Sequence, residues 1–418
     1  MMILCDIIYF SKIENRVIKV RKYIDKEVVA VSKEYEMKWK EKAVTKERGS
    51  VKGNVLISGI IICRNEEENI SKVLDSLIDL KIDEIVVIDT GSEDGTLKII
   101  ETYIYQNSNI RMYRYQWKDS FSEARNFGIR KAKNDWLFFV DADERVTNTN
   151  DRSIQSMITY YSEMCGDEIA FCPVIVSSKF NKLYGNPRIF NKKSGYRYYG
   201  NVHEMLRKSE DEYNTIPFVC LNIIIEHEGY GKRLIKSKLQ RNLRLLDFCI
   251  EKERENPIWY CYKLRDGRDF LDFDEKKQLY ENVQKIYKEN VNKSFYQYCF
   301  DWAASVFIQN VVKMGDIKLA KNLLIELLTY GKCSVEDQFY LKTLVKLLEI
   351  ETDLLNLETE CTVMQENADF SSSIIDTAGY YIDELKMRIF EKEHKMGDYF
   401  KMKEFLYSVG YICDMETI

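Results

Sequence analysis

Three acidic side chains follow a run of uncharged residues that begins at Trp136. The stretch reads WLFFVDADE, so Asp141, Asp143 and Glu144 come directly after a segment suited to the interior of a sheet. Two carboxylates one residue apart on a strand-to-loop turn can bind one hard cation, directly or through water. Magnesium or manganese held in this way keeps several waters and bridges to substrate phosphates. A solvated turn with an aspartate N-cap is the alternative interpretation.

Short polar segments elsewhere in the first half of the chain suit the same site. CRNEEENI follows one strand-like segment, DTGSEDGT follows the next, and SEARNFG precedes the acidic stretch. In open parallel sheets, ligands bind at the carboxyl ends of the strands. We therefore expect these segments to meet the acids of residues 141–143 at one edge of a sheet.

Alternating strand-like and helix-like segments indicate the elements that position this edge. The strand-like segments are rich in β-branched and aromatic residues and read NVLISGIIIC, DEIVVIDT, IRMYRYQW, DWLFFVDA and EIAFCPVIV. Between them, apolar residues recur at helical spacing in EEENISKVLDSLIDL, SEDGTLKIIETYIY and SFSEARNFGIRKA, with Ser92, Asp94 or Ser120 as N-caps. This alternation predicts an α/β domain with a mostly parallel, Rossmann-like sheet over residues 54–232.

The remainder of the chain is helix-compatible. All four prolines lie between Pro173 and Pro257, and the proline-free segment that follows contains one helix-like run after another. MGDIKLAKNLLIELL recurs loosely as MGDYFKMKEFLYSVG, which favours an all-α, TPR-like helical-repeat domain over residues 233–418, with irregular helical packing as the alternative. Residues 1–53 are charged and predict an N-terminal helical segment.

Composition excludes several classes of protein. With 45% hydrophobic residues, 28 Tyr and 20 Phe, the 418-residue chain is globular. A formal net charge of −5 gives no overall basic face for nucleic acid. No apolar run approaches the roughly 20 residues of a membrane-spanning helix. The 11 cysteines form no CxxC pair, which favours reduced thiols and a cytoplasmic location.

Taken together, the motifs resemble those of the family 2 glycosyltransferases, which have the GT-A fold. The resemblance implies a UDP-sugar as co-substrate and a divalent metal, Mg²⁺ or Mn²⁺. It assigns Asp143 of the DxD motif to the metal and Asp141 to the ribose side of the donor. Glu144 is then expected to be a loop or helix-start acid. The other donor-binding residues that the resemblance implies are Cys63, Arg64, Asn65, Glu66, Asp89, Arg125, Ala142 and Arg188.

The resemblance also implies specific roles for three of these residues. Asp89 would hydrogen-bond the uracil or the ribose, and Arg125 of the ARN motif would lie near the nucleotide or the acidic cluster. An ordinary surface ion pair is the alternative for Arg125. Arg188, in NPRIF, would either stabilise charge on the leaving diphosphate or anchor the preceding loop.

Two of the three histidines coincide with motifs of the same family. The resemblance implies that His203 and Glu204, in NVHE, approach the acceptor, and that His227, in HEGY, is a metal ligand beside Asp143. A satisfied structural histidine is the alternative. An inverting transferase must take a proton from the acceptor as it attacks the anomeric carbon. Glu204 is the favoured general base, and His203 is its rival.

The order of segments, together with GNVHE, EHEGY and ENPIWY, resembles the peptide S-glycosyltransferases of glycocin bacteriocin biosynthesis. This resemblance implies inverting transfer of a sugar, with glucose expected, to a cysteine thiol of a precursor peptide. A thiolate is a strong nucleophile that needs only modest help from a base. The helical region would bind the peptide or form a homodimer. Two alternatives stay open, namely transfer to a cell-envelope glycan or lipid-linked acceptor, and an inactive GT-A domain in a helical-repeat interaction protein.

Overall fold

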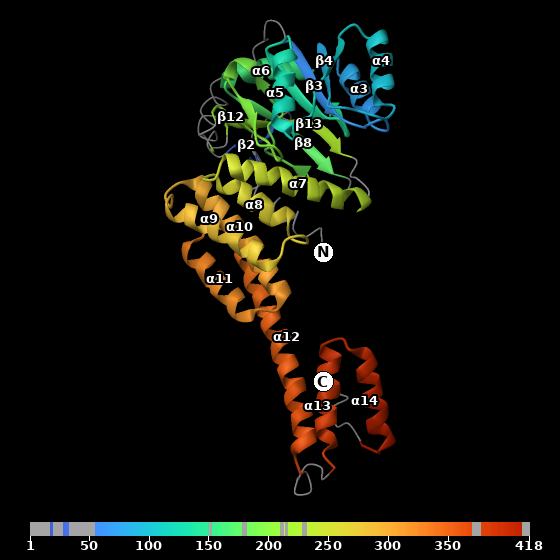
Figure 1. The fold of residues 1–418 in the computed structure, drawn as a ribbon, viewed down its shortest axis with the longest axis vertical. Helices are drawn as coiled ribbons and strands as arrows, with labels where there is room; N and C mark the ends of the chain where they lie inside the picture. Colours follow the sequence, from blue (N-terminus) through green and yellow to red (C-terminus); the bar gives the residue numbers. More distant parts are fainter. Residues whose placement is uncertain are drawn as a thin grey trace. The chain divides into compact units, whose positions relative to one another are not determined.

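The computed structural model describes most of the chain, which divides into two compact units, Met1–Phe300 and Asp301–Ile418 (Figure 1). None of the helices in the described part of the chain is both long and apolar enough to cross a bilayer. The described residues are 17–19, 28–32, 55–148, 150, 153–177, 182–209, 213, 216–227, 232–369 and 378–411.

Four parallel strands form the part of the sheet that carries the acidic stretch. In space they run β6, β3, β4 and β5, and they comprise β3 (Ile57–Cys63), β4 (Glu84–Asp89), β5 (Ile110–Arg114) and β6 (Trp136–Asp141). Their register places Cys63 beside Asp89, and Ile62 beside Asp141. The polar loops after β3, β4 and β6 therefore leave the sheet at one edge, as the sequence predicts.

Beyond β6 the sheet is mixed rather than parallel. Strand β10 (Ile189–Asn191) pairs antiparallel with both β6 and β8 (Ala170–Ser177), whereas β13 (Phe218–His227) runs parallel to β8. Two short strands pair at its margin, β7 (Glu144–Asn148) with β13 and β9 (Lys182–Leu183) with β8. A separate hairpin joins β11 (Arg197–Tyr199) to β12 (Met205–Arg207).

The N-terminal segment differs from the expected helix wherever the structure describes it. Its described residues form two strands, β1 (Val17–Lys19) and β2 (Val28–Ser32), and β2 pairs antiparallel with β13. The stretch VVAVS is rich in β-branched valine, which suits a strand with a partner better than a helix. The expectation of a helical segment over residues 1–53 is wrong for these residues.

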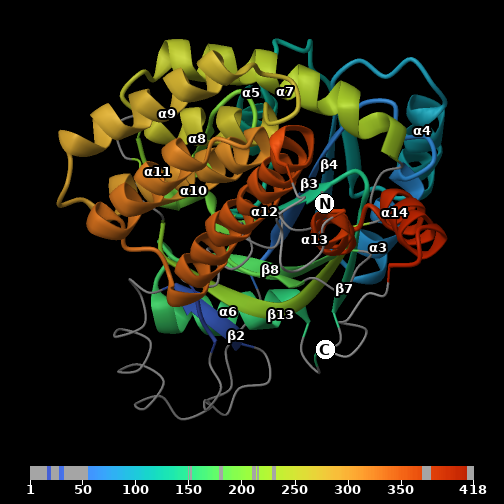
Figure 2. The same cartoon turned by 90° about the horizontal axis from the view of Figure 1, so that it is seen from below.

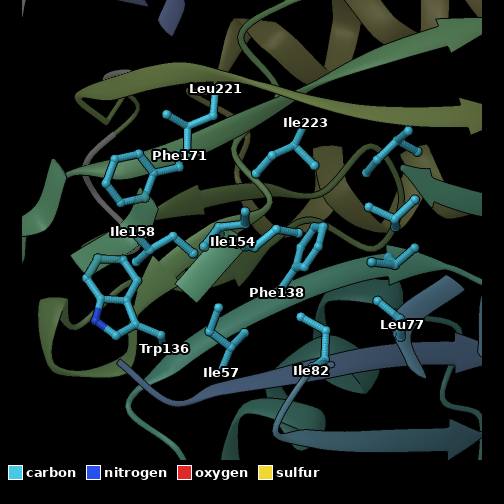
Figure 3. Packing of buried hydrophobic residues seen from close by; sticks show 14 of the residues in the cluster. Ile57, Leu77, Ile82, Trp136, Phe138, Ile154, Ile158, Phe171, Leu221 and Ile223 are labelled. Atoms are coloured by element: carbon cyan, nitrogen blue, oxygen red, sulfur yellow. The ribbon is translucent and has the colours of Figure 1, made fainter. Parts of the chain in front are cut away.

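Helices cover both faces of the sheet and bury alternate strand residues. Helices α3 (Ile70–Asp79), α4 (Thr96–Gln106) and α6 (Ile154–Cys165) pack with Ile61 and Phe138 on one face. Helix α5 (Phe121–Lys131) packs with Ile60 and Phe139 on the other. Figure 3 shows the first of these clusters, in which Phe138 and Phe171 of the sheet lie near Ile154 and Ile158 of α6. Side chains of this size each contribute about 1.5–3 kcal/mol when buried.

The rest of the chain is helical, as expected. Helices α7 (Lys232–Lys252), α8 (Pro257–Asp266) and α9 (Phe273–Lys288) belong to the first unit and pack against one another in sequence order (Figure 2). Helix α10 (Ser294–Met314) includes the division between the units. The second unit continues with α11 (Ile317–Tyr330), α12 (Val335–Asn367), α13 (Tyr380–Lys392) and α14 (Met396–Ser408).

Candidate functional site

The loops after β3 and β4 are joined by direct hydrogen bonds. The amide of Asn65 donates to Ser92 Oγ at 3.0 Å, and Asn65 Oδ1 accepts from the amide of Glu93 at 2.8 Å. The amide of Glu66 donates to Thr96 Oγ1 at 2.8 Å. Asn65 has a φ of 55°, a left-handed conformation that asparagine tolerates better than most residues. These hydrogen bonds hold the loops after β3 and β4 together at the edge of the sheet.

Asp89 shapes its own loop. Its carboxylate accepts hydrogen bonds from the amides of Gly91 and Ser92, each at 3.1 Å, and the residue is only 2% exposed.

The predicted helix N-caps have different outcomes in the structure. Ser120 caps α5 by accepting from the amide of Glu123, which confirms that prediction. Helix α4 instead has Gly95 at its N-cap, without a side-chain hydrogen bond.

Two buried arginines hold Asp141 at the end of β6. Arg125 Nη2 donates to Asp141 Oδ1 at 2.8 Å, and Arg188 Nη2 donates to Asp141 Oδ2 at 2.9 Å. Although burial opposes ionisation, the two guanidinium groups hold the pKa of Asp141 well below its usual range. Both carboxylate oxygens of Asp141 are therefore occupied by protein groups, so Asp141 anchors this wall of the site.

Glu144 is a buried member of the same network, and the expectation of a loop or helix-start acid is wrong. It begins strand β7, is 3% exposed, and accepts from the amide of Asp141 at 2.8 Å and from Arg188 at 3.2 Å. Burial raises the pKa of Glu144 to about 7, with Arg188 acting in the opposite direction. The sequence does not reveal this role, because the segment after Asp143 turns back into a strand that pairs with β13.

Arg125 of the ARN motif on α5 connects the end of β6 to the loop between β11 and β12. Arg125 also contacts Glu204 through Nε, and its guanidinium carbon lies 5.3 Å from the ring centre of Tyr198. The next residue, Asn126, donates to the carbonyl of Tyr198 at 2.8 Å and accepts from its amide at 2.9 Å. Arg125 is thus a buried link in the network, and not a surface ion pair.

A cavity of about 1090 Å³ lies at the edge formed by β3 and β6. This is the point where the strand order reverses, since β4 follows on one side of β3 and β6 lies on the other. Every residue that the sequence nominates for the site lines this cavity except Asp89 and His227. The side chain of His227 lies outside the described part of the structure, which gives only its backbone in β13. The nominated lining residues are Cys63, Arg64, Asn65, Glu66, Arg125, Asp141, Ala142, Asp143, Arg188, His203 and Glu204.

His203 lies in the loop between β11 and β12 and reaches helix α8. Its Nε2 is 2.7 Å from Asp266 Oδ2, and its ring stacks on Tyr262 with centroids 4.3 Å apart. Arg265 Nη2 is 3.1 Å from the same nitrogen. Burial, with Arg265 adding to it, lowers the pKa of His203 below its ordinary value, so the ring is neutral at pH 7.

Helix α7 adds polar residues that the sequence reading did not select. Lys238, Arg241 and Asn242 line the same cavity as Asp143, and the first two carry the opposite charge. Burial lowers the pKa of Lys238. Their spacing of three and four residues puts them on one face of the helix. That spacing was the available signal, but a basic helix offers many such faces, and only the packing of α7 selects one.

Asp143, which the resemblance assigns to a divalent metal, is one of the acids that line the cavity. Among the residues that the structure describes, no group of three or more His, Cys, Asp or Glu side chains could hold a metal ion by itself. A cation that bridges a diphosphate needs fewer protein ligands, because phosphate oxygens and waters complete its shell. A divalent cation bound at Asp143 would therefore need phosphate oxygens and waters to complete its shell.

Comparisons with known proteins point to one family. Residues 58–217 match the model of Glycosyl transferase family 2. The chain is 30% identical over 241 residues to the SPbeta prophage-derived glycosyltransferase SunS of Bacillus subtilis, which covers 56% of this chain and 55% of that protein. It is 30% identical over 120 residues to the lipopolysaccharide core biosynthesis glycosyltransferase LpsC of Rhizobium meliloti, which covers 29% of this chain and 43% of that protein.

Among solved structures, S. aureus TarS matches with a TM-score of 0.39 and 13% identity, over 64% of this chain and 54% of that one. The chain spans about half the length of the curated relatives it matches. Its α/β domain holds the family match, and an all-helical region follows that domain. Residues 58–217 therefore form a domain that matches glycosyl transferase family 2, and the chain is similar to SunS over about half of its length.

Proposed function

We propose that this protein transfers a sugar from a UDP-sugar, with glucose expected, to a cysteine thiol of a precursor peptide, with inversion at the anomeric carbon. The observation that carries the proposal is that one cavity, at the β3–β6 edge, is lined by Asp143 and the basic face of α7 together with His203 and Glu204. Such a cavity has groups for a metal-bound diphosphate and groups for an acceptor proton.

On the donor side, Asp143 would hold a divalent cation, with His227 as the second expected ligand. When bound, the cation neutralises charge on the departing nucleoside diphosphate. Lys238 and Arg241 line the same cavity and add positive charge for the diphosphate oxygens. Arg188 lines the cavity and also holds Asp141, so it would add positive charge near the leaving diphosphate.

On the acceptor side, the cysteine proposal rests on the likeness to the peptide S-glycosyltransferases and on the similarity to SunS. Two neighbouring residues are candidates for the general base. Glu204 contacts Arg125, and His203 contacts Asp266. The helical region would bind the peptide, because Val335 and Phe339 of α12 are 77% and 69% exposed. A cytoplasmic location and a homodimer stay predictions.

Transfer to a cell-envelope glycan is the second candidate function. It is favoured by the 30% identity to LpsC over 120 residues. The two candidates differ in the acceptor, whereas the donor side of the cavity serves either one. An acceptor experiment therefore separates them.

The test is to incubate the protein with a panel of UDP-sugars, Mn²⁺ and a synthetic cysteine-bearing precursor peptide, and to follow intact mass. We expect the peptide to gain sugar and to lose its thiol reactivity, and Asp143→Asn to abolish transfer. A Cys→Ser peptide that accepts sugar equally well would contradict the S-linkage. Transfer to a glycan acceptor with an unmodified peptide would favour the second candidate. UDP binding that does not depend on metal would contradict the role of Asp143.

A further inference from the structure

Asp266, the last residue of α8, contacts the acceptor-side histidine and has no part in the function proposed above. Its Oδ2 lies 2.7 Å from His203 Nε2, and Asp266 is 6% exposed. Tyr262, one turn earlier on α8, stacks on the His203 ring at an interplanar angle of 14°. The tyrosine therefore sets the plane of the imidazole, and the aspartate sets its rotation within that plane.

The charge of Asp266 determines which ring nitrogen carries the proton. Arg265 donates from Nε to Asp266 Oδ1 at 2.7 Å. Although burial opposes ionisation, Arg265 and His203 hold the pKa of Asp266 well below its usual range, so Asp266 accepts hydrogen bonds. Arg265 Nη2 lies 3.1 Å from His203 Nε2 but only 2.6 Å from Asp266 Oδ1, and it donates to that oxygen. Nε2 of His203 is then the donor to Asp266 Oδ2 at 2.7 Å, which leaves the lone pair on Nδ1. Nδ1 has no hydrogen-bond partner among the residues that the structure describes, and His203 lines the cavity.

The backbone of His203 supports a positioned side chain. Its φ is 51°, in the left-handed region that residues with a Cβ adopt at a cost. Such conformations persist where the surrounding structure determines them, and they cluster at functional sites. Here the contacts to Tyr262 and Asp266 are the surrounding structure.

The neighbouring Glu204 is engaged differently. It contacts Arg125, which also holds Asp141, and the Glu204 side chain is 12% exposed. Protonation of Glu204 would remove one of the two carboxylates that balance this buried guanidinium. His203 accepts a proton on Nδ1 without losing the contact between Nε2 and Asp266, and the carboxylate of Asp266 offsets the charge of Arg265 beside the ring.

We propose that Asp266 is a positioning residue, which orients His203 so that Nδ1 takes the acceptor proton. The proposal rests on the proposed function. In the step, the thiol proton moves to Nδ1, and the sulfur electron pair forms the bond to the anomeric carbon. The bond between that carbon and the diphosphate oxygen breaks, and its electron pair leaves with the nucleoside diphosphate.

The first test reads the tautomer without any activity. Only three histidines occur in the chain, so ¹⁵N-labelled histidine gives few signals, and His203→Gln identifies the one that matters. Long-range ¹H–¹⁵N spectra should give a His203 ring protonated on Nε2, and Asp266→Asn should shift it towards the Nδ1-protonated form. A wild-type ring protonated on Nδ1 would overturn the proposal, whatever the enzyme transfers.

The second test reads the reaction. Asp266→Asn should lower kcat for peptide transfer about 10- to 100-fold while the Kd for UDP stays within about twofold, and Asp266→Glu should recover part of the loss. Asp269→Asn is the matched control, because Asp269 is an exposed acid three residues further on. Transfer by Asp266→Asn within threefold of wild type, or an equal loss of UDP binding, would overturn the proposal. A wild-type protein that binds UDP, has the expected tautomer and modifies no peptide would instead contradict the proposed acceptor.

Discussion

Arg188 Nη2 lies 3.2 Å from the carboxylate of Glu144, and the two side chains are 9% and 2% exposed. The same nitrogen donates to Asp141 at 2.9 Å. One buried guanidinium therefore ties the end of β6 to the start of β7. Removal of one partner from such a pair leaves the other charge buried without compensation.

Arg188→Met should lower the free energy of unfolding by about 3 kcal/mol, because it removes the cation beside the buried carboxylate of Glu144 and leaves Asp141 with Arg125 alone. Urea denaturation followed by circular dichroism measures this change. Lys193→Met is the control, since its ion pair with Asp135 is 69% and 53% exposed and should contribute little. Equal effects of the two substitutions would contradict the structural role of Arg188.

Gly200→Ala should disrupt the loop that carries His203. Gly200 has a φ of +102°, and an added Cβ would lie 2.4 Å from Cη2 of Trp259, which is buried. We expect a loss of about 2 kcal/mol or more in stability, together with slower transfer. Gly195→Ala is the control, because φ is +79° there and nothing lies within 4 Å of the added Cβ. If Gly200→Ala lost no more stability than Gly195→Ala, the Trp259 side chain would have to move to accommodate the added Cβ.

Lys238→Ala and Arg241→Ala should each weaken binding of UDP about 5- to 20-fold, which corresponds to roughly 1–2 kcal/mol at a charged contact. Binding of uridine should not change, because the nucleoside lacks the diphosphate. Calorimetry with both ligands measures the difference. Arg244→Ala is the control on the same helix, since Arg244 is 58% exposed and pairs with Asp119 at 2.7 Å. If both substitutions weakened uridine binding as much as UDP binding, the two cations would instead contact the uracil base or the ribose.

The edge of the sheet could be predicted because it depends on local pattern and on one rule of topology. Uncharged, β-branched and aromatic runs ending at Cys63, Asp89 and Asp141 predict parallel strands, and parallel strands bring their carboxyl ends together. The observed register joins all three ends. The N-terminal strand β2 could not be predicted in this way, because its partner strand, β13, lies far away in the sequence.

The partners of the site residues depend on contacts that no local pattern contains. Arg125 and Glu204 are 79 positions apart, and His203 and Asp266 are 63 apart. Motifs indicated that Arg125, His203 and Glu204 belong to one site. Which carboxylate holds which cation follows from the packing of α5 and α8 against the loops, and the sequence does not encode that choice in any spacing.

Cys63 should resist both alkylation and self-modification, although it lines the donor cavity. Burial raises the pKa of its thiol well above the ordinary value, with Asp89 and Glu66 adding to the effect, and the residue is 2% exposed. A thiol that stays protonated is a poor nucleophile. Intact mass after incubation with UDP-sugar and Mn²⁺ should give an unmodified enzyme chain. Iodoacetamide at pH 8 should label the partly exposed Cys333 well before Cys63, as read by peptide mapping. Sugar found on Cys63, or alkylation of Cys63 as fast as Cys333, would mean that the cavity stabilises its thiolate.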